Sequence, residues 1–295
     1  MKLLIILCSI CIFHCEGFSN NKQQLFYKAD SLFEKKEYQL AGIEYDRIAY
    51  SASTNETKVI SLIKKADCYL LRNNFSVAEK CLLRIAYYDI GDSLHYAARI
   101  ATATAAYLNS NFELAESQII QIKSFVTDTS LYTNCLPLYA LILNESNRWS
   151  EAQQTLLQYI NSNQFISSAQ KEAYANEINT IYSQKNIPKL KNVEKAKNLS
   201  TFLPGTGQLY LGYVAEGVAS VAFQLVGLGF TGLCIWQKYY VTGALIGFSF
   251  FQKFYAGGIT RTEFLANRKN YNMKRKFNDE AKNIILEFNQ IKKAP

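Results

Sequence analysis

The sequence predicts an all-α protein in which a solenoid of helical hairpins precedes an apolar two-helix transmembrane hairpin and a basic C-terminal helix. Three observations lead to this prediction. Small and aromatic residues recur every 37 residues in the first half of the chain, residues 199–260 are strongly apolar, and residues 261–295 are basic. The overall hydrophobic content of 49% is ordinary, so the division rests on where the apolar residues lie.

Residues 1–19 have the pattern of a signal peptide. A lysine follows the initiator methionine, and the apolar run from Leu3 to Phe13 is too short to span a bilayer comfortably. Gly17 and Ser19 supply the small residues needed for cleavage before Asn20. The sequence therefore predicts export of the mature chain.

The chain has seven cysteines, three of which precede the predicted cleavage site. Cys15 suggests a lipoprotein as the alternative, but His14 stands where a lipidation signal has a small residue, so cleavage without lipidation is favoured. No CxxC pair occurs, which argues against a metal site. Export would permit a disulfide between Cys68 and Cys81, although buried free thiols are the favoured interpretation.

Small and aromatic residues recur with a 37-residue period between residues 20 and 187. The aligned positions are Ala29, Ala66, Ala103 and Ala140, then Tyr38, Phe75, Phe112 and Trp149, then Ala41, Ala78, Ala115 and Ala152. The first alanine lets a second helix approach closely, the aromatic closes the turn, and the second alanine lies one helical turn later on the same face. Each period therefore predicts a pair of packed helices.

These columns resemble the tetratricopeptide repeat over residues 22–162. Ala29, Leu32, Tyr38, Ala41 and Tyr45 have the relative spacing of that family. The period here is 37 residues rather than about 34, and the closing proline is missing. The resemblance implies stacked helix pairs with a groove that binds a protein or peptide. Residues 167–185 are predicted to form a further helix that covers the open end of the stack.

Residues 188–198 read as a basic linker, and residues 199–260 as the transmembrane hairpin. The apolar run Tyr213–Trp236 has 24 residues, enough to cross about 30 Å of hydrocarbon. A polar turn follows, and Tyr239–Gly258 returns over 20 residues. Glycines in both runs would allow the two helices to pack closely. A buried core hairpin of a soluble protein is the alternative.

A Pro-Gly-x-Gly-Gln-x-Tyr-x-Gly sequence opens this region. It consists of Pro204, Gly205, Gly207, Gln208, Tyr210 and Gly212. Such a sequence breaks a helix, and its tyrosine suits the headgroup level. Gln208 and Leu209 stand where a phosphate-binding loop needs Lys and Ser or Thr, which excludes that site.

The segment from about residue 198 to 272 resembles a bacterial family of two-helix membrane modules with this opening. Tyr255 and Gly257 match the family's closing turn, and Ala266, Asn267 and Asn270 match the Ala/Asn-rich helix that follows. The resemblance implies residence in a membrane and no defined activity.

Residues 261–295 contain nine Lys and Arg against four Asp and Glu. Beside an apolar hairpin, this charge favours an anionic membrane surface over nucleic acid, and a solvated helix face is the alternative. Basic flanks would place the hairpin ends in the cytoplasm, whereas the signal peptide places the repeats in the periplasm. We favour export, because long domains translocate largely regardless of charge; an outer-membrane or peripheral association would also remove the conflict.

The sequence does not predict an enzyme. It has two histidines, His14 and His95, and shows no paired carboxylates, nucleophile elbow or metal cluster, so we expect no catalytic residues, cofactor, metal or small-molecule substrate. The predicted function is a membrane-anchored scaffold that binds proteins or peptides in the bacterial cell envelope. The alternative is that the hairpin itself acts in membrane protein or lipid insertion. An enzyme or transporter subunit would require Glu216, Gln224 and Lys253 to form a polar site.

Overall fold

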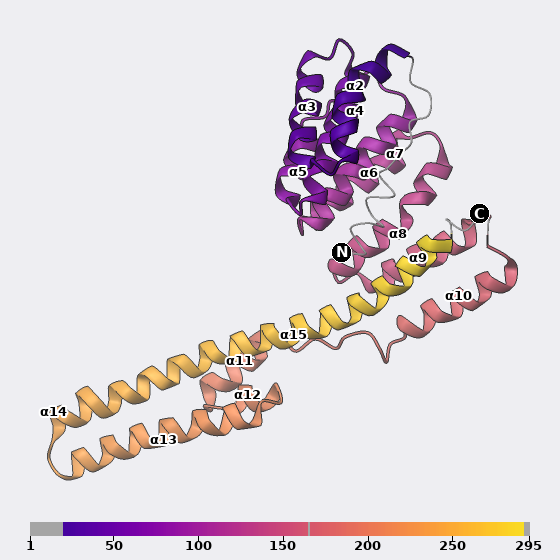
Figure 1. Ribbon diagram of the computed structural model, residues 1–295. Coiled ribbons are helices and arrows are strands. Elements are labelled where there is room, and N and C mark those ends of the chain that lie inside the picture. The colour runs from indigo at the N-terminus through magenta and orange to yellow at the C-terminus, as the bar shows by residue number, and fades with distance from the viewer. Residues whose placement is uncertain (1–19, 165, 292–295) are drawn as a thin grey trace. The chain divides into compact units, whose positions relative to one another are not determined.

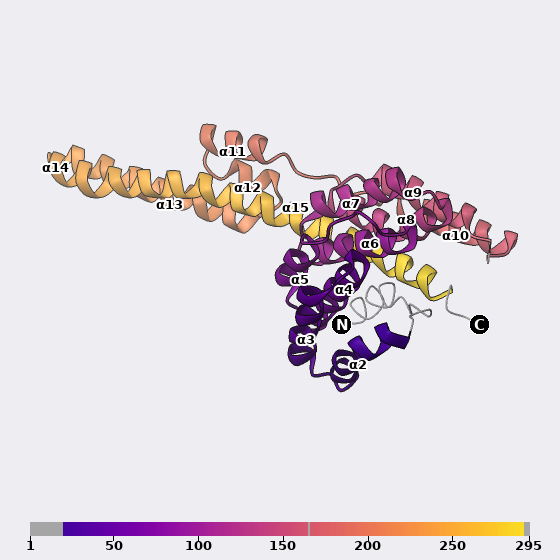
Figure 2. The same cartoon turned by 90° about the horizontal axis from the view of Figure 1, so that it is seen from above.

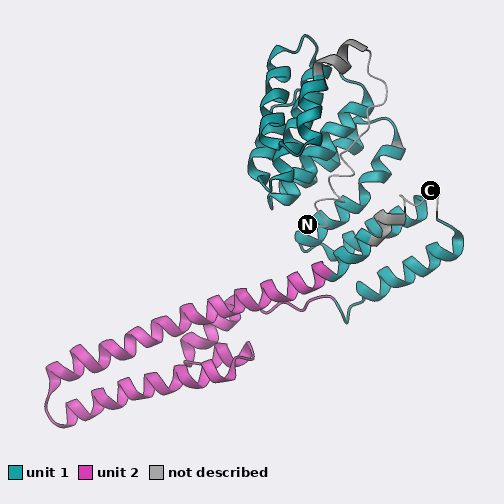
Figure 3. Cartoon of the chain, in the orientation of Figure 1, with its two compact units in different colours: residues 1–186, 280–295 teal, residues 187–279 magenta. Residues whose placement is uncertain are grey.

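A computed structural model describes residues 20–164 and 166–291, and all regular structure in these ranges is helical. The predicted all-α class is confirmed for this part of the chain. The residues divide into two compact units (Figure 3). Unit 1 comprises residues 1–186 and 280–295, and unit 2 comprises residues 187–279. The predicted signal peptide, residues 1–19, lies outside the described residues.

Unit 1 is a succession of short helices (Figures 1 and 2). They are α2 (Asn20–Glu34), α3 (Tyr38–Ser51), α4 (Asn55–Leu71), α5 (Phe75–Leu82), α6 (Asp92–Leu108), α7 (Phe112–Phe125), α8 (Thr129–Glu145), α9 (Trp149–Ser162) and α10 (Ser168–Ile181). Each helix packs on the next, and α6 also contacts both α4 and α8. The starts of α3, α5, α7 and α9 are 37 residues apart, as are those of α4, α6 and α8.

The turns between paired helices repeat with the same spacing. Their left-handed residues, with φ between 58° and 63°, are Lys36, Asn73, Ser110 and Asn147. In each turn, the next N–H donates to the carbonyl five residues earlier, as in Asn74 to Tyr69 at 2.9 Å. This Schellman geometry satisfies carbonyls that the helix end leaves free and reverses the chain at a fixed angle.

The alanine columns lie where the helices approach most closely. All eight of the aligned alanines are at most 1% exposed: Ala29, Ala41, Ala66, Ala78, Ala103, Ala115, Ala140 and Ala152. The aromatic column, Tyr38, Phe75, Phe112 and Trp149, supplies the first residue of each second helix and is half-buried. The Tyr38 ring lies 5.3 Å from that of Phe33, across the turn that separates α2 from α3.

The last helix of the stack, α10, packs on α9. It begins with a capping box in which Ser167 and Gln170 exchange hydrogen bonds. Just after its end, the Tyr182 hydroxyl and the Asn144 side chain form two buried hydrogen bonds of 2.7 and 3.0 Å. This helix falls within the segment predicted to cover the stack.

Unit 2 is a hairpin with two short helices at its base (Figures 1 and 2). It contains α11 (Val193–Phe202), α12 (Thr206–Tyr210), α13 (Val214–Trp236), α14 (Tyr240–Thr242), the π-helix η1 (Gly243–Phe248) and the first part of α15 (Ser249–Ile291). Among the described residues, α13 is the one helix that is long and apolar enough to cross a membrane, with a mean hydropathy of 1.9.

The structure differs from the expected segment boundaries in two places. The predicted linker 188–198 contains the first turns of α11, whose start is capped by the Asn192 side chain at 2.8 Å from the Lys195 N–H. The predicted tail 261–295 does not begin a new helix, because α15 runs unbroken from Ser249 to Ile291. No proline follows Gly258 within this helix, so nothing in the local sequence ends it.

Candidate functional site

The opening motif builds the base of the unit 2 hairpin. Gly205 has φ of 86°, which suits glycine, and starts α12 after the turn at Pro204. A Cβ atom at Gly205 would lie 2.5 Å from the carbonyl oxygen of Gly217 in α13. The two glycines therefore allow the turn to touch the backbone of the long apolar helix.

Gly207 is the tightest position of the motif. A Cβ atom there would lie 2.2 Å from the carbonyl oxygen of Ala196 and 2.3 Å from Ser200 Oγ. Its N–H donates to Ser200 Oγ at 3.1 Å. Only a residue without a side chain fits between α11 and α15 at this position.

Gln208 fixes α12 to α15 through a buried polar cluster. Its Nε2 donates to the carbonyl of Gly258 at 3.2 Å, and its Oε1 accepts a hydrogen bond from Ser200 Oγ at 3.2 Å. Thr262 Oγ1 lies 2.9 Å from Ser200 Oγ and donates to the same Gly258 carbonyl at 2.8 Å. Gln208, Ser200 and Thr262 are at most 2% exposed, so this cluster stabilises the base only because its polar atoms have partners.

The end of the motif connects the base to the apolar helix. Gly212, with φ of 86°, ends α12 in the same Schellman geometry found in unit 1, and α13 begins two residues later. Lys269 Nζ donates to the carbonyl of Leu211 at 2.5 Å. Lys191 Nζ lies 5.0 Å from the centre of the Tyr210 ring.

The two closing residues of the motif, Tyr255 and Gly257, have different surroundings. The Tyr255 hydroxyl donates to the carbonyl of Thr201 at 2.8 Å and so joins α15 to the end of α11. Gly257 is exposed and has open space where a side chain would be. The structure therefore brings together Gly205, Gly207, Gln208 and Tyr255, and leaves Gly257 on the outside.

The three candidates for a polar site in the hairpin do not converge. Glu216 accepts two hydrogen bonds from Arg261, at 2.7 and 2.9 Å, which join the start of α13 to α15. Gln224 is 4% exposed, and its buried Oε1 has no hydrogen-bond partner among the described residues. Lys253 is exposed. The structure thus shows an interhelical ion pair in place of a shared polar site.

The two arms of the hairpin meet at glycines. A Cβ atom at Gly227 would be 3.0 Å from the ring of Phe250, and one at Gly247 would be 2.3 Å from Thr231 Oγ1. The opposite faces of α13 expose large apolar side chains: Val214, Val218, Val221, Phe223, Leu225, Val226, Leu228, Phe230, Leu233, Ile235 and Trp236. Only 17% of the residues in the most apolar stretch of α13 are buried, whereas a core helix of a soluble protein is mostly buried.

Unit 1 has a shallow cleft of about 380 Å³ between α3 and α4. Its lining residues are Gly42, Ile43, Asp46, Arg47, Tyr50, Lys65 and Tyr69. Asp46 pairs with Lys65 at 2.7 Å and with Arg84 at 3.2 Å. Burial opposes ionisation of Asp46, but these two cations hold its pKa below the usual value. The cleft therefore presents fixed charges next to exposed tyrosine and isoleucine surface.

Several further groups in unit 1 have a buried polar atom without a hydrogen-bond partner among the described residues, and Asp67, His95 and Arg99 are three of them. Burial raises the pKa of Asp67 to about 8, and its Oδ1 has no partner within the described ranges. The Arg99 guanidinium lies 3.6 Å from the centre of the Tyr87 ring and donates to Gln118 at 2.9 Å. Burial, followed by the charge of Arg99, lowers the pKa of His95.

The four cysteines of the described residues, Cys68, Cys81, Cys135 and Cys234, are buried free thiols. Within the same residues, no group of His, Cys, Asp and Glu side chains could hold a metal ion. Comparisons with protein-family models, with curated proteins and with solved structures returned no match to this chain.

The sequence pattern identified the glycines of the base but not their partners. Gly258 lies 50 residues from Gln208, and the two partners Ser200 and Thr262 are themselves 62 residues apart. A signal existed only for Gly258, which adjoins the predicted Gly257, and for the asparagine-rich helix after it.

Proposed function

We propose that this protein is a membrane-anchored scaffold of the bacterial cell envelope, in which a tetratricopeptide-like unit 1 binds a protein or peptide. The observation that carries the proposal is the pairing of two different surfaces in one chain. Unit 1 buries its alanine columns completely, whereas α13 in unit 2 exposes a continuous apolar surface over 23 residues. Such a surface is stable in lipid and not in water.

The 37-residue recurrence of helix starts, left-handed turns and buried alanines supports repeated helix pairs in unit 1. Pairs of this kind stack into solenoids that bind extended partners along one face. Under this proposal, the signal peptide directs unit 1 to the periplasm and the hairpin holds it at a membrane.

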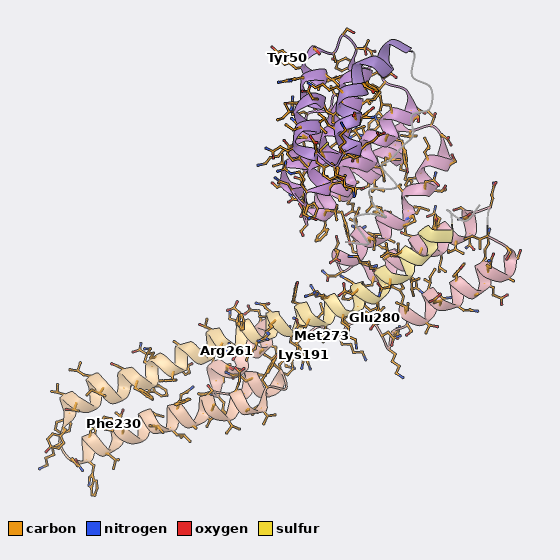
Figure 4. All side chains as sticks on the ribbon, viewed as in Figure 1. Tyr50, Lys191, Phe230, Arg261, Met273 and Glu280 are labelled. Atoms are coloured by element: carbon orange, nitrogen blue, oxygen red, sulfur yellow. The ribbon has the colours of Figure 1, made fainter. Side chains whose placement is uncertain are left out.

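The cleft between α3 and α4 is the binding surface that we assign to the partner. It combines Tyr50, which is 95% exposed, with the charges of Asp46 and Lys65 (Figure 4 labels Tyr50). Exposed tyrosine beside fixed charges of both signs suits a peptide with apolar and ionic side chains.

Site-specific photocrosslinking in living cells tests this surface on the full chain. A photoreactive phenylalanine analogue at Tyr50 should yield a discrete covalent adduct with an envelope protein. The same analogue at Tyr88, which is 63% exposed but does not line the cleft, is the matched control and should yield none. Equal labelling at both positions, or none at either, would contradict the assignment.

A replacement experiment separates the scaffold from the alternative in which the hairpin itself acts on membrane proteins or lipids. Residues 187–279 are replaced by an unrelated transmembrane hairpin in a strain that depends on the protein. A scaffold should retain its function with the foreign anchor. Loss of function with a folded, membrane-bound chimera would favour an active hairpin.

A further inference from the structure

The net charge of the chain is concentrated in unit 2. Residues 187–279 contain twelve Lys and Arg against four Asp and Glu, a net charge of +8. This equals the charge of the whole chain, because the remaining residues contain twenty of each kind. A neutral lipid surface would not account for this concentration of positive charge beside an apolar hairpin.

Three lysines of unit 2 gather where α13 begins. Lys191 and Lys195 place their Nζ atoms 5.0 and 5.5 Å from the centre of the Tyr210 ring. Lys269 places its Nζ 5.9 Å from the centre of the Tyr213 ring. We call Lys191, Lys195 and Lys269 the lysine collar. Figure 4 shows Lys191 at the opposite end of the hairpin from Phe230, near the tip.

The collar is held in position by contacts that leave its charge available. Asn270 accepts a hydrogen bond from the Lys191 N–H at 2.7 Å and donates to the Lys191 carbonyl at 2.8 Å. Lys269 donates to the Leu211 carbonyl. These contacts involve neutral groups, so they fix the Lys191 backbone and the Lys269 side chain without pairing either ammonium with a carboxylate.

The neighbouring Lys197, unlike the three collar lysines, is paired with carboxylates. Hydrogen bonding to Glu263, with the nearby charge of Glu194, raises the pKa of Lys197. Among the residues that the structure describes, no carboxylate lies within ion-pair distance of Lys191, Lys195 or Lys269. The collar therefore has three cations beside tyrosine rings, and these cations are available to bind an anion from outside the chain.

We propose that the lysine collar binds the phosphate of an anionic phospholipid headgroup. Tyr213 immediately precedes the apolar α13, so the collar lies at the level where a hydrocarbon-spanning helix meets the headgroups. Tyrosine at this level presents an apolar ring to lipid, while the lysines bring positive charge to the phosphate. This inference rests on the proposed membrane residence of the hairpin and adds the class of lipid that it selects.

The test titrates fluorescent phosphatidylglycerol into the full-length protein held in neutral detergent micelles. The variant Lys191→Gln/Lys195→Gln/Lys269→Gln should bind it roughly 100-fold more weakly, at about fivefold per lysine. The control variant Lys35→Gln/Lys80→Gln/Lys185→Gln removes the same charge from exposed positions of unit 1 and should bind like the unaltered protein. Equal affinities in all three proteins would overturn the proposal.

Further variants separate lipid binding from folding and from other anions. The pair Lys191→Gln/Lys195→Gln leaves the Lys269 hydrogen bond intact and should still bind the lipid roughly 25-fold more weakly than the unaltered protein. Asn270→Ala should weaken binding while circular dichroism stays unchanged. Phosphatidylcholine should not compete; competition by inorganic phosphate or by an oligonucleotide as strong as that by phosphatidylglycerol would contradict a lipid site.

The outcome also distinguishes this inference from the proposed function. If the hairpin does not reside in a membrane, the protein is released from membranes by alkaline carbonate. If only the collar is wrong, the protein resists carbonate and shows no preference for anionic lipid.

Discussion

Replacing Gly207 by alanine tests whether the base of the hairpin is packed as described. The new methyl group would lie 2.2 Å from the Ala196 carbonyl oxygen and 2.3 Å from Ser200 Oγ, the acceptor of the Gly207 N–H. Overpacking of this kind costs about 1–3 kcal/mol, and loss of the hydrogen bond to a buried N–H adds about 1–3 kcal/mol. The helical preference of alanine over glycine returns at most about 1 kcal/mol. We expect a net loss of about 2–4 kcal/mol in the stability of unit 2.

Gly257→Ala is the matched control for this variant. Gly257 belongs to the same motif and lies in α15, but a Cβ atom there meets no atom within 4 Å. Its replacement should stabilise the helix by up to about 1 kcal/mol. The two changes are chemically identical, so their difference isolates the contact made by Gly207.

Hydrogen exchange measured by mass spectrometry reports the effect locally, which matters because the chain has two units that need not unfold together. In neutral detergent micelles, amides of α11 and α12 should exchange roughly 30-fold faster or more in Gly207→Ala, since about 1.4 kcal/mol corresponds to a factor of ten. Unchanged exchange in that variant, or equal acceleration in Gly257→Ala, would refute the packing described for the base.

Three further predictions concern single contacts. Burial raises the pKa of Asp67 to about 8 in the folded chain, against 3.8 for the free side chain, so between these pH values the folded state binds a proton that the unfolded state does not. The free energy of unfolding should therefore fall from about pH 4 to pH 8, by at most about 1.4 kcal/mol per pH unit. Urea denaturation at several pH values should show a smaller slope in Asp67→Asn. Tyr182→Phe leaves the buried Asn144 side chain without its partner and should cost about 1–3 kcal/mol, measured by hydrogen exchange in α8. Gly243→Cys places a Cβ atom 3.1 Å from that of Cys234, so mild oxidation should crosslink the two hairpin arms, and a Cys234→Ser background should abolish the crosslink.

The repeated helix pairs were predictable because their signal is local. Alanine and aromatic columns at a constant period identify which residues face a partner helix, and the period survives in the starts of α3, α5, α7 and α9. The short length of α5, which ends at Leu82, was not predictable. The Asn55 side chain donates to the carbonyls of Ala86 and Tyr88 and holds the segment after α5 out of a helix, and this contact spans more than 30 residues.

The candidate site likewise has features that the sequence predicts and features that it does not. The glycines of the opening motif and the apolar character of α13 are readable from sequence, because each reflects the residue type itself. The buried partners Ser200 and Thr262, and the clasp of Lys191 by Asn270, depend on which helix faces which, so the sequence gives no direct sign of them. The sequence predicted a boundary after residue 260, because charge and hydropathy change there. The helical backbone of α15 continues across that point.

Membrane extraction of the full-length protein tests whether its hairpin resides in lipid. After removal of peripheral proteins with alkaline carbonate, the protein should remain in the membrane pellet and should dissolve only when detergent is added. The exposed apolar face of α13 is the reason. A full-length protein that purifies as a soluble monomer without detergent would show that the hairpin does not reside in a membrane.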